Sequence, residues 1–454
     1  MSSSRVLARS ASAVLRSDVC AFCWARPWPP IARNAAAAQS VASRVHRRSY
    51  AQKLDVKRLR ADVDKRSRLG WYRMTRDQKV LLLQPDVAEA IYNDFVAHKD
   101  GKEYGKLVKQ LVSKYNTTTE HLAGLAIMTF SIPDLSDPAK RALLPPSPHK
   151  PTSMQLLQGC ADLRDPLAVK HLLTAVYLAN YTASPLAAAV EMASLVPRSA
   201  IPALRTSLAS LKIAGHDDPE ALTLLGLFLE AENHPAKARA AYEAALAVPW
   251  VYAYSVQARH PAQLPVAPPW VALGYLLRGA RDPTERALAR GVFELGAKKG
   301  DDPLACWEYA SYLPKGDGAE REEWLRFVSK AAASGHREAM LALARFYREM
   351  AAGRAVRSGG LAASLHWLLR WREGSAIALA REWYHAAGRA GQKEACMELA
   401  EWYMQEGEGE MATSVLEEIV QPAEKGREEE FPQIVLRAKR MLEGGRGGGG
   451  FKKG

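Results

Sequence analysis

The sequence predicts an all-α protein: an α-solenoid of stacked antiparallel helical hairpins, preceded by an N-terminal segment that is cleaved off. Three observations support this prediction. A phrase of small and apolar residues recurs at helical spacing after a glycine, the first fifty residues are basic, and two proline-rich stretches interrupt helical patterns. The 454 residues suffice for two or three ordinary domains or for one long solenoid.

Residues 1–50 contain eight arginines, no lysine and one acidic residue, Asp18. Basic segments of this kind form the amphipathic helix of a mitochondrial transit peptide. The segment ends in Arg48-Ser49-Tyr50-Ala51, which resembles the cleavage pattern of mitochondrial processing peptidases, so we expect the mature chain to start near Ala51. A basic tail or an RNA-binding arm is the alternative. Import predicts a location in the mitochondrial matrix or on the matrix face of the inner membrane.

The charge and hydropathy of the rest of the chain are ordinary. The net charge is +13, but removal of residues 1–50 leaves 54 basic and 48 acidic residues, so the remainder carries only +6. This excess is a weak indication of a nucleic-acid partner. No apolar run reaches the ~18 residues that a membrane-spanning helix needs. We therefore expect no transmembrane helix, and peripheral association with the inner membrane stays open.

The cysteines predict neither a disulfide framework nor a zinc site. Cys20 and Cys23 lie within the leader, and Cys160, Cys306 and Cys396 are far apart and odd in number. Searches for a His-Glu-x-x-His motif, a phosphate-binding loop, a nucleophile elbow and a dinucleotide fingerprint also find nothing. The sequence thus predicts a protein that is not an enzyme and holds no cofactor or metal.

The recurring phrase is clearest at two glycines. Counted from Gly335 and from Gly391, residues at offsets of 4, 8, 9 and 12 are small or apolar: Ala339, Leu343, Ala344 and Tyr347 in one copy, and Ala395, Leu399, Ala400 and Tyr403 in the other. These offsets lie on one face of a helix. Each glycine is suited to end the preceding helix in a left-handed conformation, and His336 and His216 at such turns are expected to cap or pack.

Two looser copies precede them. One follows Gly300 and carries Ala305, Tyr309 and Ala310, shifted by one inserted residue; the other starts at Gly215-His216. The phrase resembles the Sel1-like subclass of tetratricopeptide repeats, most clearly over residues 287–404. The resemblance implies stacked helical hairpins. By chance, alanine-rich helices produce similar spacings, and that alternative also predicts stacked helices. The longer interval between Gly335 and Gly391 implies an inserted loop or an extra helix.

The predicted organisation has five parts. They are a transit peptide (1–50), an N-terminal helical region (51–130) in which Gln84-Pro85 starts a helix, a proline-rich linker (131–153), the helical-repeat solenoid (154–440) and a disordered Gly-rich tail (441–454). Residues 51–70 stand out as a charged segment, and the stretch 249–269 is a second proline-rich break within the solenoid.

The fold prediction favours a non-catalytic adaptor of mitochondria. Stacked hairpins form concave surfaces for protein partners, and the resemblance implies a role in assembling a respiratory-chain complex. We expect partner contacts near Tyr309, Tyr347, Tyr403, Arg354 and Arg357, although the tyrosines could equally be core residues. The alternative is an RNA- or ribosome-associated expression factor, which the basic clusters at 53–68 and 354–372 favour.

Overall fold

The computed structural model describes residues 56–101, 103–135, 142–182, 185–213, 216–249, 262–313, 319–352, 374–422 and 429–447. These residues fall into two compact units, one ending at Pro269 and one beginning at Trp270. The predicted leader with Arg48, Tyr50 and Ala51, and the predicted contact residues Arg354 and Arg357, lie outside the described ranges.

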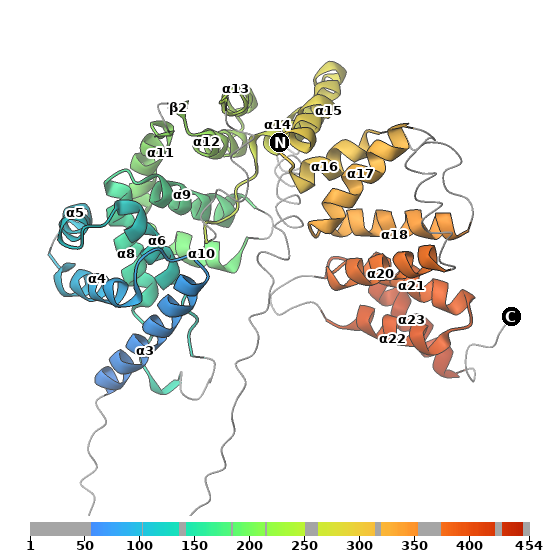
Figure 1. Ribbon diagram of the computed structural model, residues 1–454, viewed down its shortest axis with the longest axis horizontal. Coiled ribbons are helices and arrows are strands. Elements are labelled where there is room, and N and C mark those ends of the chain that lie inside the picture. The colour runs from blue at the N-terminus through green and yellow to red at the C-terminus, as the bar shows by residue number, and fades with distance from the viewer. Residues whose placement is uncertain are drawn as a thin grey trace, which may run out of the picture. The chain divides into compact units, whose positions relative to one another are not determined.

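The first unit is a succession of helices (Figure 1). They are α3 (Val56–Asp77), α4 (Pro85–His98), α5 (Tyr104–Lys114), α6 (Thr119–Phe130), α8 (His149–Asp162), α9 (Pro166–Tyr181), α10 (Ala187–Ser194), the 3-10 turn η1 (Arg198–Ala200), α11 (Ile201–Ala209), α12 (Pro219–Ala231) and α13 (Pro235–Leu246). Two strands of two residues each, β1 (Lys212–Ile213) and β2 (His216–Asp217), pair antiparallel between α11 and α12.

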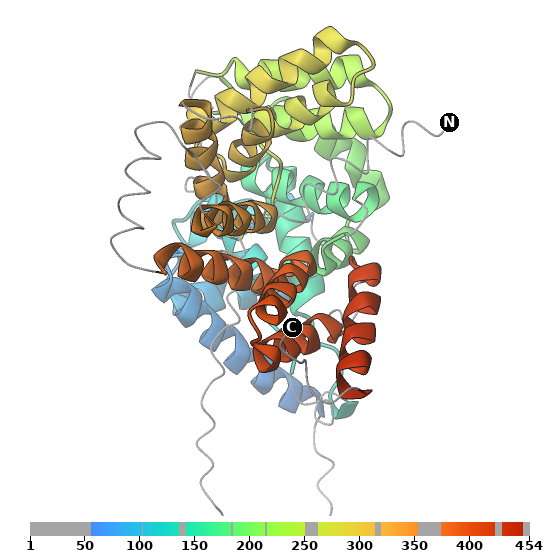
Figure 2. The same cartoon turned by 90° about the vertical axis from the view of Figure 1, so that its right-hand side faces the viewer.

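The second unit continues the helical succession, which Figure 2 follows by colour from yellow to red. Its helices are α14 (Pro269–Arg278), α15 (Pro283–Lys298), α16 (Pro303–Ser311), α17 (Ala319–Ala333), α18 (Arg337–Ala351), α20 (Ser375–Arg389), α21 (Lys393–Gln405), α22 (Gly409–Val420) and α23 (Pro432–Gly447). In both units most helices pack against their chain neighbours. The prediction of an all-α protein built from adjacent packed helices is confirmed.

Aspartate followed by proline starts many of these helices. The Asp side chain caps the helix by accepting hydrogen bonds from backbone N–H groups, and proline at the first helical position loses nothing because its N–H would be unpaired there. Four helices begin this way, at Asp165-Pro166, Asp218-Pro219, Asp282-Pro283 and Asp302-Pro303. The predicted start of a helix at Pro85 is also confirmed.

The predicted glycine turns are present. Gly335 and Gly391 have φ values of 99° and 92°, which are left-handed. The amide of His336 then donates to the carbonyl of Ala331, and the amide of Gln392 to that of Ala387, closing the same C-terminal cap in both copies. His336 caps the next helix, as expected, because its Nδ1 accepts the amide of Ala339. Seven of the eight phrase residues are buried, and Tyr347 is half-buried.

The copy at Gly300 is more regular than the sequence indicates. The left-handed residue there is Asp301, with φ 48°, and not Gly300. Counted from Asp301, Ala305, Tyr309 and Ala310 have offsets of 4, 8 and 9, and all three are buried. The predicted extra residue is present, because four residues separate α15 from α16 and three separate α17 from α18. Arg164, with φ 59°, begins a copy that the search for glycine missed, with buried Ala168, Leu172, Leu173 and Val176 at offsets 4, 8, 9 and 12.

Other predicted boundaries differ from the structure. Before α12, His216 of the weak copy belongs to strand β2, which pairs with β1, and does not follow a helix end, while Gly215 lies outside the described residues. The last residues of the predicted linker 131–153 belong to α8, which packs on α5 and α6, and the compact units divide at 269 rather than at 153. Helix α23 runs to Gly447, past the predicted start of the tail at 441, because Met441 and Leu442 continue its apolar stripe.

Candidate functional site

Helix α3 buries polar residues where an ordinary helix buries apolar ones. Arg60, Asp64, Arg68 and Tyr72 follow each other at intervals of four residues and are all buried. This spacing places them on one face of the helix. Burial of a charge is costly unless the charge is paired and hydrogen-bonded, so the partners of these side chains decide whether the arrangement is stable.

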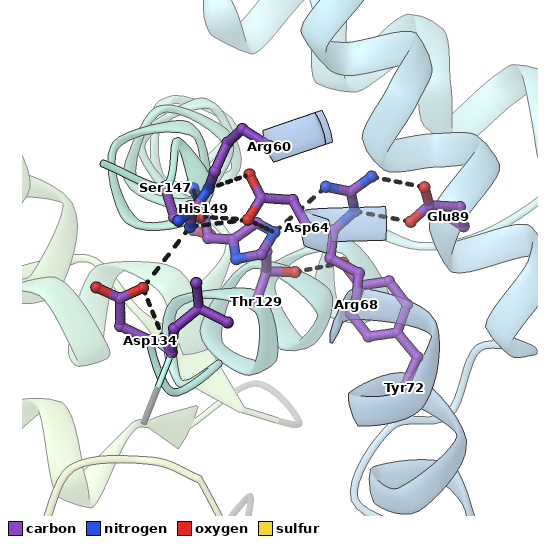
Figure 3. A network of polar contacts seen from close by, with 11 residues as sticks. Arg60, Asp64, Arg68, Tyr72, Glu89, Thr129, Asp134, Ser147 and His149 are labelled. Carbon is purple, nitrogen blue, oxygen red and sulfur yellow. Dashed lines mark hydrogen bonds and ion pairs between the residues drawn. The ribbon is translucent and has the colours of Figure 1, made fainter. Parts of the chain in front are cut away.

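Arg60 and Asp64 form the first pair of this polar network (Figure 3). The Nε of Arg60 donates to Asp64 Oδ2 at 3.0 Å, and Nη2 lies 2.8 Å from Oδ1. Asp134, beyond the end of α6, lies 3.7 Å from the same Nη2. Asp64 accepts a further hydrogen bond from the hydroxyl of Ser147 at 3.1 Å. The pair thus ties α3 to the residues that precede α8.

Arg68 forms the second pair. Its Nε and Nη2 donate to the two carboxylate oxygens of Glu89 on α4, at 2.8 and 2.6 Å. This two-pronged contact is the strongest geometry available to a guanidinium and a carboxylate. Burial opposes the charge of Arg68, but the hydrogen bonds and charge of Glu89 outweigh it and raise its pKa. The guanidinium also lies 4.3 Å over the ring of Tyr92.

His149, at the start of α8, joins the two pairs. Its Nε2 lies 3.3 Å from Nη1 of Arg68 and 3.9 Å from Oδ1 of Asp64. An arginine can only donate, so Nε2 accepts, which assigns a neutral ring with its proton on Nδ1. Burial lowers the pKa of His149 to about 4, against the opposing charge of Asp64. The ring is therefore uncharged at neutral pH.

The far end of the polar stripe joins α3 to α6. Thr129 donates its hydroxyl proton to the carbonyl of Leu125 at 2.8 Å, so the Tyr72 hydroxyl donates to Thr129 Oγ1 at 2.7 Å. Burial raises the pKa of Tyr72 strongly. Together the contacts fix α3 on α4, α6 and the start of α8. The paired charges and the neutral histidine favour a structural role for the network over acid–base chemistry.

The opposite face of α3 is exposed and basic. Arg58, Lys65, Arg66 and Arg73 are exposed there, together with the acids Asp62 and Asp77, and Lys57 is exposed one turn before Arg60 at the start of the helix. The basic cluster at 53–68 therefore divides into two groups. Arg60 and Arg68 serve the interior, and the remaining described cations of that cluster face solvent.

A second buried polar network lies in the same unit. Lys170 on α9 contacts Asp218 Oδ2 at 2.9 Å and Glu220 Oε2 at 2.8 Å. Gln263 donates to the other oxygen of Glu220 at 3.0 Å, and His171 Nδ1 accepts the amide of Leu264 at 3.3 Å. These contacts hold the end of the second proline-rich break against α9 and α12.

The tyrosines predicted to contact a partner differ in exposure. Tyr309 and Tyr403 are only 2% and 3% exposed. Tyr309 packs edge-on against Phe327, and Tyr403 lies under the guanidinium of Arg381. Both fit the alternative reading as core residues. Tyr347 is half-buried beside Phe346, so it is the one of the three that a partner can reach without rearrangement of the core.

The described residues offer little room for a metal ion or a small molecule. Within the described part of the chain, no three His, Cys, Asp or Glu side chains gather closely enough to hold a metal ion. A hollow between α22 and α23 is lined mostly by charged side chains: Glu417, Val420, Lys439, Leu442 and Glu443. The hollow is open to solvent, whereas ligand sites enclose most of the surface of their ligand. None of the described helices has the length and apolar character to cross a membrane.

The polar stripe of α3 was not predicted from the sequence. Its signal is the run of alternating charges Arg60, Asp64 and Arg68 at four-residue spacing, which is usually typical of a solvated helix face.

The comparisons with known proteins add no family: no protein-family model matches the chain, and no curated protein matches it significantly.

Proposed function

We propose that this protein is a non-catalytic scaffold of the mitochondrial matrix that binds other proteins, in the assembly of a respiratory-chain complex. The observation that carries the proposal is the succession of packed helices joined by one recurring turn at Arg164, Asp301, Gly335 and Gly391. Stacked helical pairs of this kind present extended surfaces for peptides or helices of a partner. We assign the repeats over 287–404 to the Sel1-like tetratricopeptide type on the basis of that turn and its buried offsets.

The compartment rests on the leader and not on the helical units. Eight arginines with a single acid over fifty residues, followed by the Arg48-Ser49-Tyr50-Ala51 pattern, favour import and cleavage. Association with the matrix face of the inner membrane would be peripheral. Import of the full chain into isolated mitochondria, followed by sequencing of the processed N-terminus, tests this part; a start far from Ala51 or a chain that stays outside contradicts it.

The partner surface is proposed around Tyr347. This tyrosine is half-buried, packs against the edge of the apolar core and has a fixed position on α18, which packs on both α17 and α20. Aromatic side chains in such settings commonly anchor protein partners. Arg354 and Arg357 follow it closely in the sequence and are proposed to add charge to the same contact.

Site-directed photocrosslinking tests this surface. A benzophenone side chain would replace Tyr347 in one variant and exposed Arg326 on α17 in a matched control. Irradiation in isolated mitochondria should attach a second polypeptide at position 347 and much less at position 326. Equal labelling at both positions, or no protein adduct at 347, contradicts the proposed surface.

The second candidate function is association with RNA. The exposed cations of α3 favour it, whereas the burial of Arg60 and Arg68 removes two cations from the cluster that supports it. True RNA-reading helical repeats present polar residues at fixed positions in every repeat. The phrase positions here are small or apolar and mostly buried, so the repeats themselves favour the protein-binding role.

A further inference from the structure

The outer face of α3 is an unusually regular cationic surface. Arg58, Arg66 and Arg73 follow one another at steps of eight and seven residues. At 1.5 Å per residue the three span roughly 22 Å along the helix. Lys65 lies next to Arg66 and is also exposed. The result is a face of net positive charge, on which Asp62 lies between Arg58 and Arg66 and Asp77 follows Arg73 by one turn.

The buried stripe holds this surface in one orientation. A helix fixed by apolar contacts can rotate or slide at modest cost, whereas paired buried charges permit few alternatives. Arg68 must meet Glu89 on α4, and Asp64 must meet Ser147 before α8. These contacts are on the opposite side from Arg66 and Arg73, so the network keeps the cations directed outward. Such preorganisation reduces the entropic cost of binding.

The surroundings of the cations decide which polyanion fits. Between Arg60 and Arg73 the exposed positions of α3 carry only small or charged side chains: Ala61, Asp62, Lys65, Arg66 and Gly70. Protein interfaces need apolar or aromatic anchors at their centre, and a membrane-surface helix needs an apolar face to insert. The larger exposed apolar side chains of α3, Val56 and Leu59, are confined to its first turn.

We propose that the outer face of α3 binds the phosphate backbone of RNA without reading its sequence. Arginine suits this role because its guanidinium recognises phosphate through two parallel hydrogen bonds. No exposed aromatic side chain of α3 offers a stacking platform for bases, which agrees with backbone recognition. This activity goes beyond the scaffold role and does not depend on it. Asp62 lies on the same face and opposes the binding.

Fluorescence anisotropy of a labelled 20-nucleotide single-stranded RNA measures the binding, with the full chain as titrant. The test variant is R58Q/R66Q/R73Q. The matched control, K106Q/K109Q/K237Q, removes the same charge from exposed positions on α5 and α13. The leader, with its eight arginines, is present in every variant, so its contribution is constant. Glutamine is a good helix former, so α3 should stay folded, and circular dichroism checks this.

Each lost phosphate contact should lower the slope of log K against log salt by about 0.7. The slope for the test variant, which lacks three such contacts, should therefore be smaller by about 2. If the two proteins bind equally at 1 M salt, this difference in slope means that the test variant binds on the order of 100-fold more weakly at 0.1 M salt. The control variant should change little. In the opposite direction, D62N should tighten binding a few-fold, which damage to the fold cannot imitate.

Photocrosslinks from 4-thiouridine in the RNA should fall within residues 56–79. Equal losses in the test and control variants, crosslinks confined to residues 1–50, or a wild-type chain that does not bind the RNA would overturn the proposal. Binding of the wild type to vesicles with anionic phospholipids but not to RNA would also overturn it and assign the face to a membrane surface. Failure here leaves the photocrosslinking result at Tyr347 unaffected, so the two proposals are tested separately.

Discussion

The ion pair between Arg68 and Glu89 offers the sharpest test of how α3 is held. The two side chains are only 7% and 8% exposed, and two hydrogen bonds join them. Loss of one partner leaves the other charge buried without compensation. Such single substitutions in buried pairs cost about 3–5 kcal/mol, whereas replacement of both partners by apolar residues of similar volume is often close to neutral.

We therefore expect R68M and E89L each to destabilise the first unit by about 3–5 kcal/mol. The R68M/E89L variant should lose much less than the sum of the two, which corresponds to a coupling energy of several kcal/mol. The Glu89 carboxylate keeps Asn93 at 3.2 Å in R68M, and the Arg68 guanidinium keeps His149 at 3.3 Å in E89L, so the two single variants should lose similar amounts. Urea unfolding followed by circular dichroism measures the free energy of unfolding of each variant.

Hydrogen exchange measured on peptides from α3 shows whether the loss of stability seen in urea arises in this part of the chain. The exposed pair Lys106–Glu103, with side chains 76% and 75% exposed, serves as the control, and its double-mutant cycle should show coupling below about 1 kcal/mol. Additive losses at Arg68 and Glu89, or single variants as stable as the wild type, would refute the reasoning that the buried pair holds α3.

Three further predictions concern pH, backbone conformation and thiol reactivity. Because the pKa of His149 falls from 6.5 to about 4 on folding, the unfolded chain binds more protons between these values. Stability should therefore be complete above pH 6.5 and fall by about 3 kcal/mol as the pH drops to 4. Urea titrations at several pH values should show that H149Q loses less stability than the wild type as the pH drops. Gly391→Ala, at φ 92°, should cost about 1–2 kcal/mol, whereas Gly291→Ala, in an open helix position, should be neutral or stabilising; thermal unfolding that ranks them the other way contradicts the turn assignment. Burial raises the pKa of Cys160 far above its usual range, so it should resist iodoacetamide at pH 8 until the chain is unfolded, and mass spectrometry of native samples should find it unmodified.

The helical repeats were largely predictable because their signal is local. A glycine followed by small and apolar residues at offsets of 4, 8, 9 and 12 identifies both the turn and the buried face, as Gly335 and Gly391 show. The turn at Arg164 was missed because arginine rarely adopts a left-handed conformation, and the turn at Asp301 was misplaced because Gly300 directly precedes it and glycine adopts that conformation most readily. The tertiary structure selects the conformation at those positions, and sequence propensity does not.

The polar stripe of α3 could not be predicted from α3 alone. Arg60, Asp64 and Arg68 have the spacing of an exposed helix face with internal salt bridges. The partners that allow the stripe to be buried are Glu89 on α4 and His149 on α8. Both are far from α3 in the sequence, so the pattern of α3 itself does not predict them. Among the tyrosines, the sequence could not separate core from surface, because Tyr347 and Tyr403 share offset 12 after their turns and yet differ in exposure.

The central claim is that this protein binds proteins rather than acting through RNA alone. The most direct measurement is affinity purification of the tagged full-length chain from isolated mitochondria after chemical crosslinking, with and without nuclease. We predict that subunits or assembly factors of a respiratory-chain complex are recovered in equal yield under both conditions. Recovery of mitochondrial ribosomal proteins and RNA that nuclease disperses would contradict the scaffold role and assign the protein to mitochondrial gene expression.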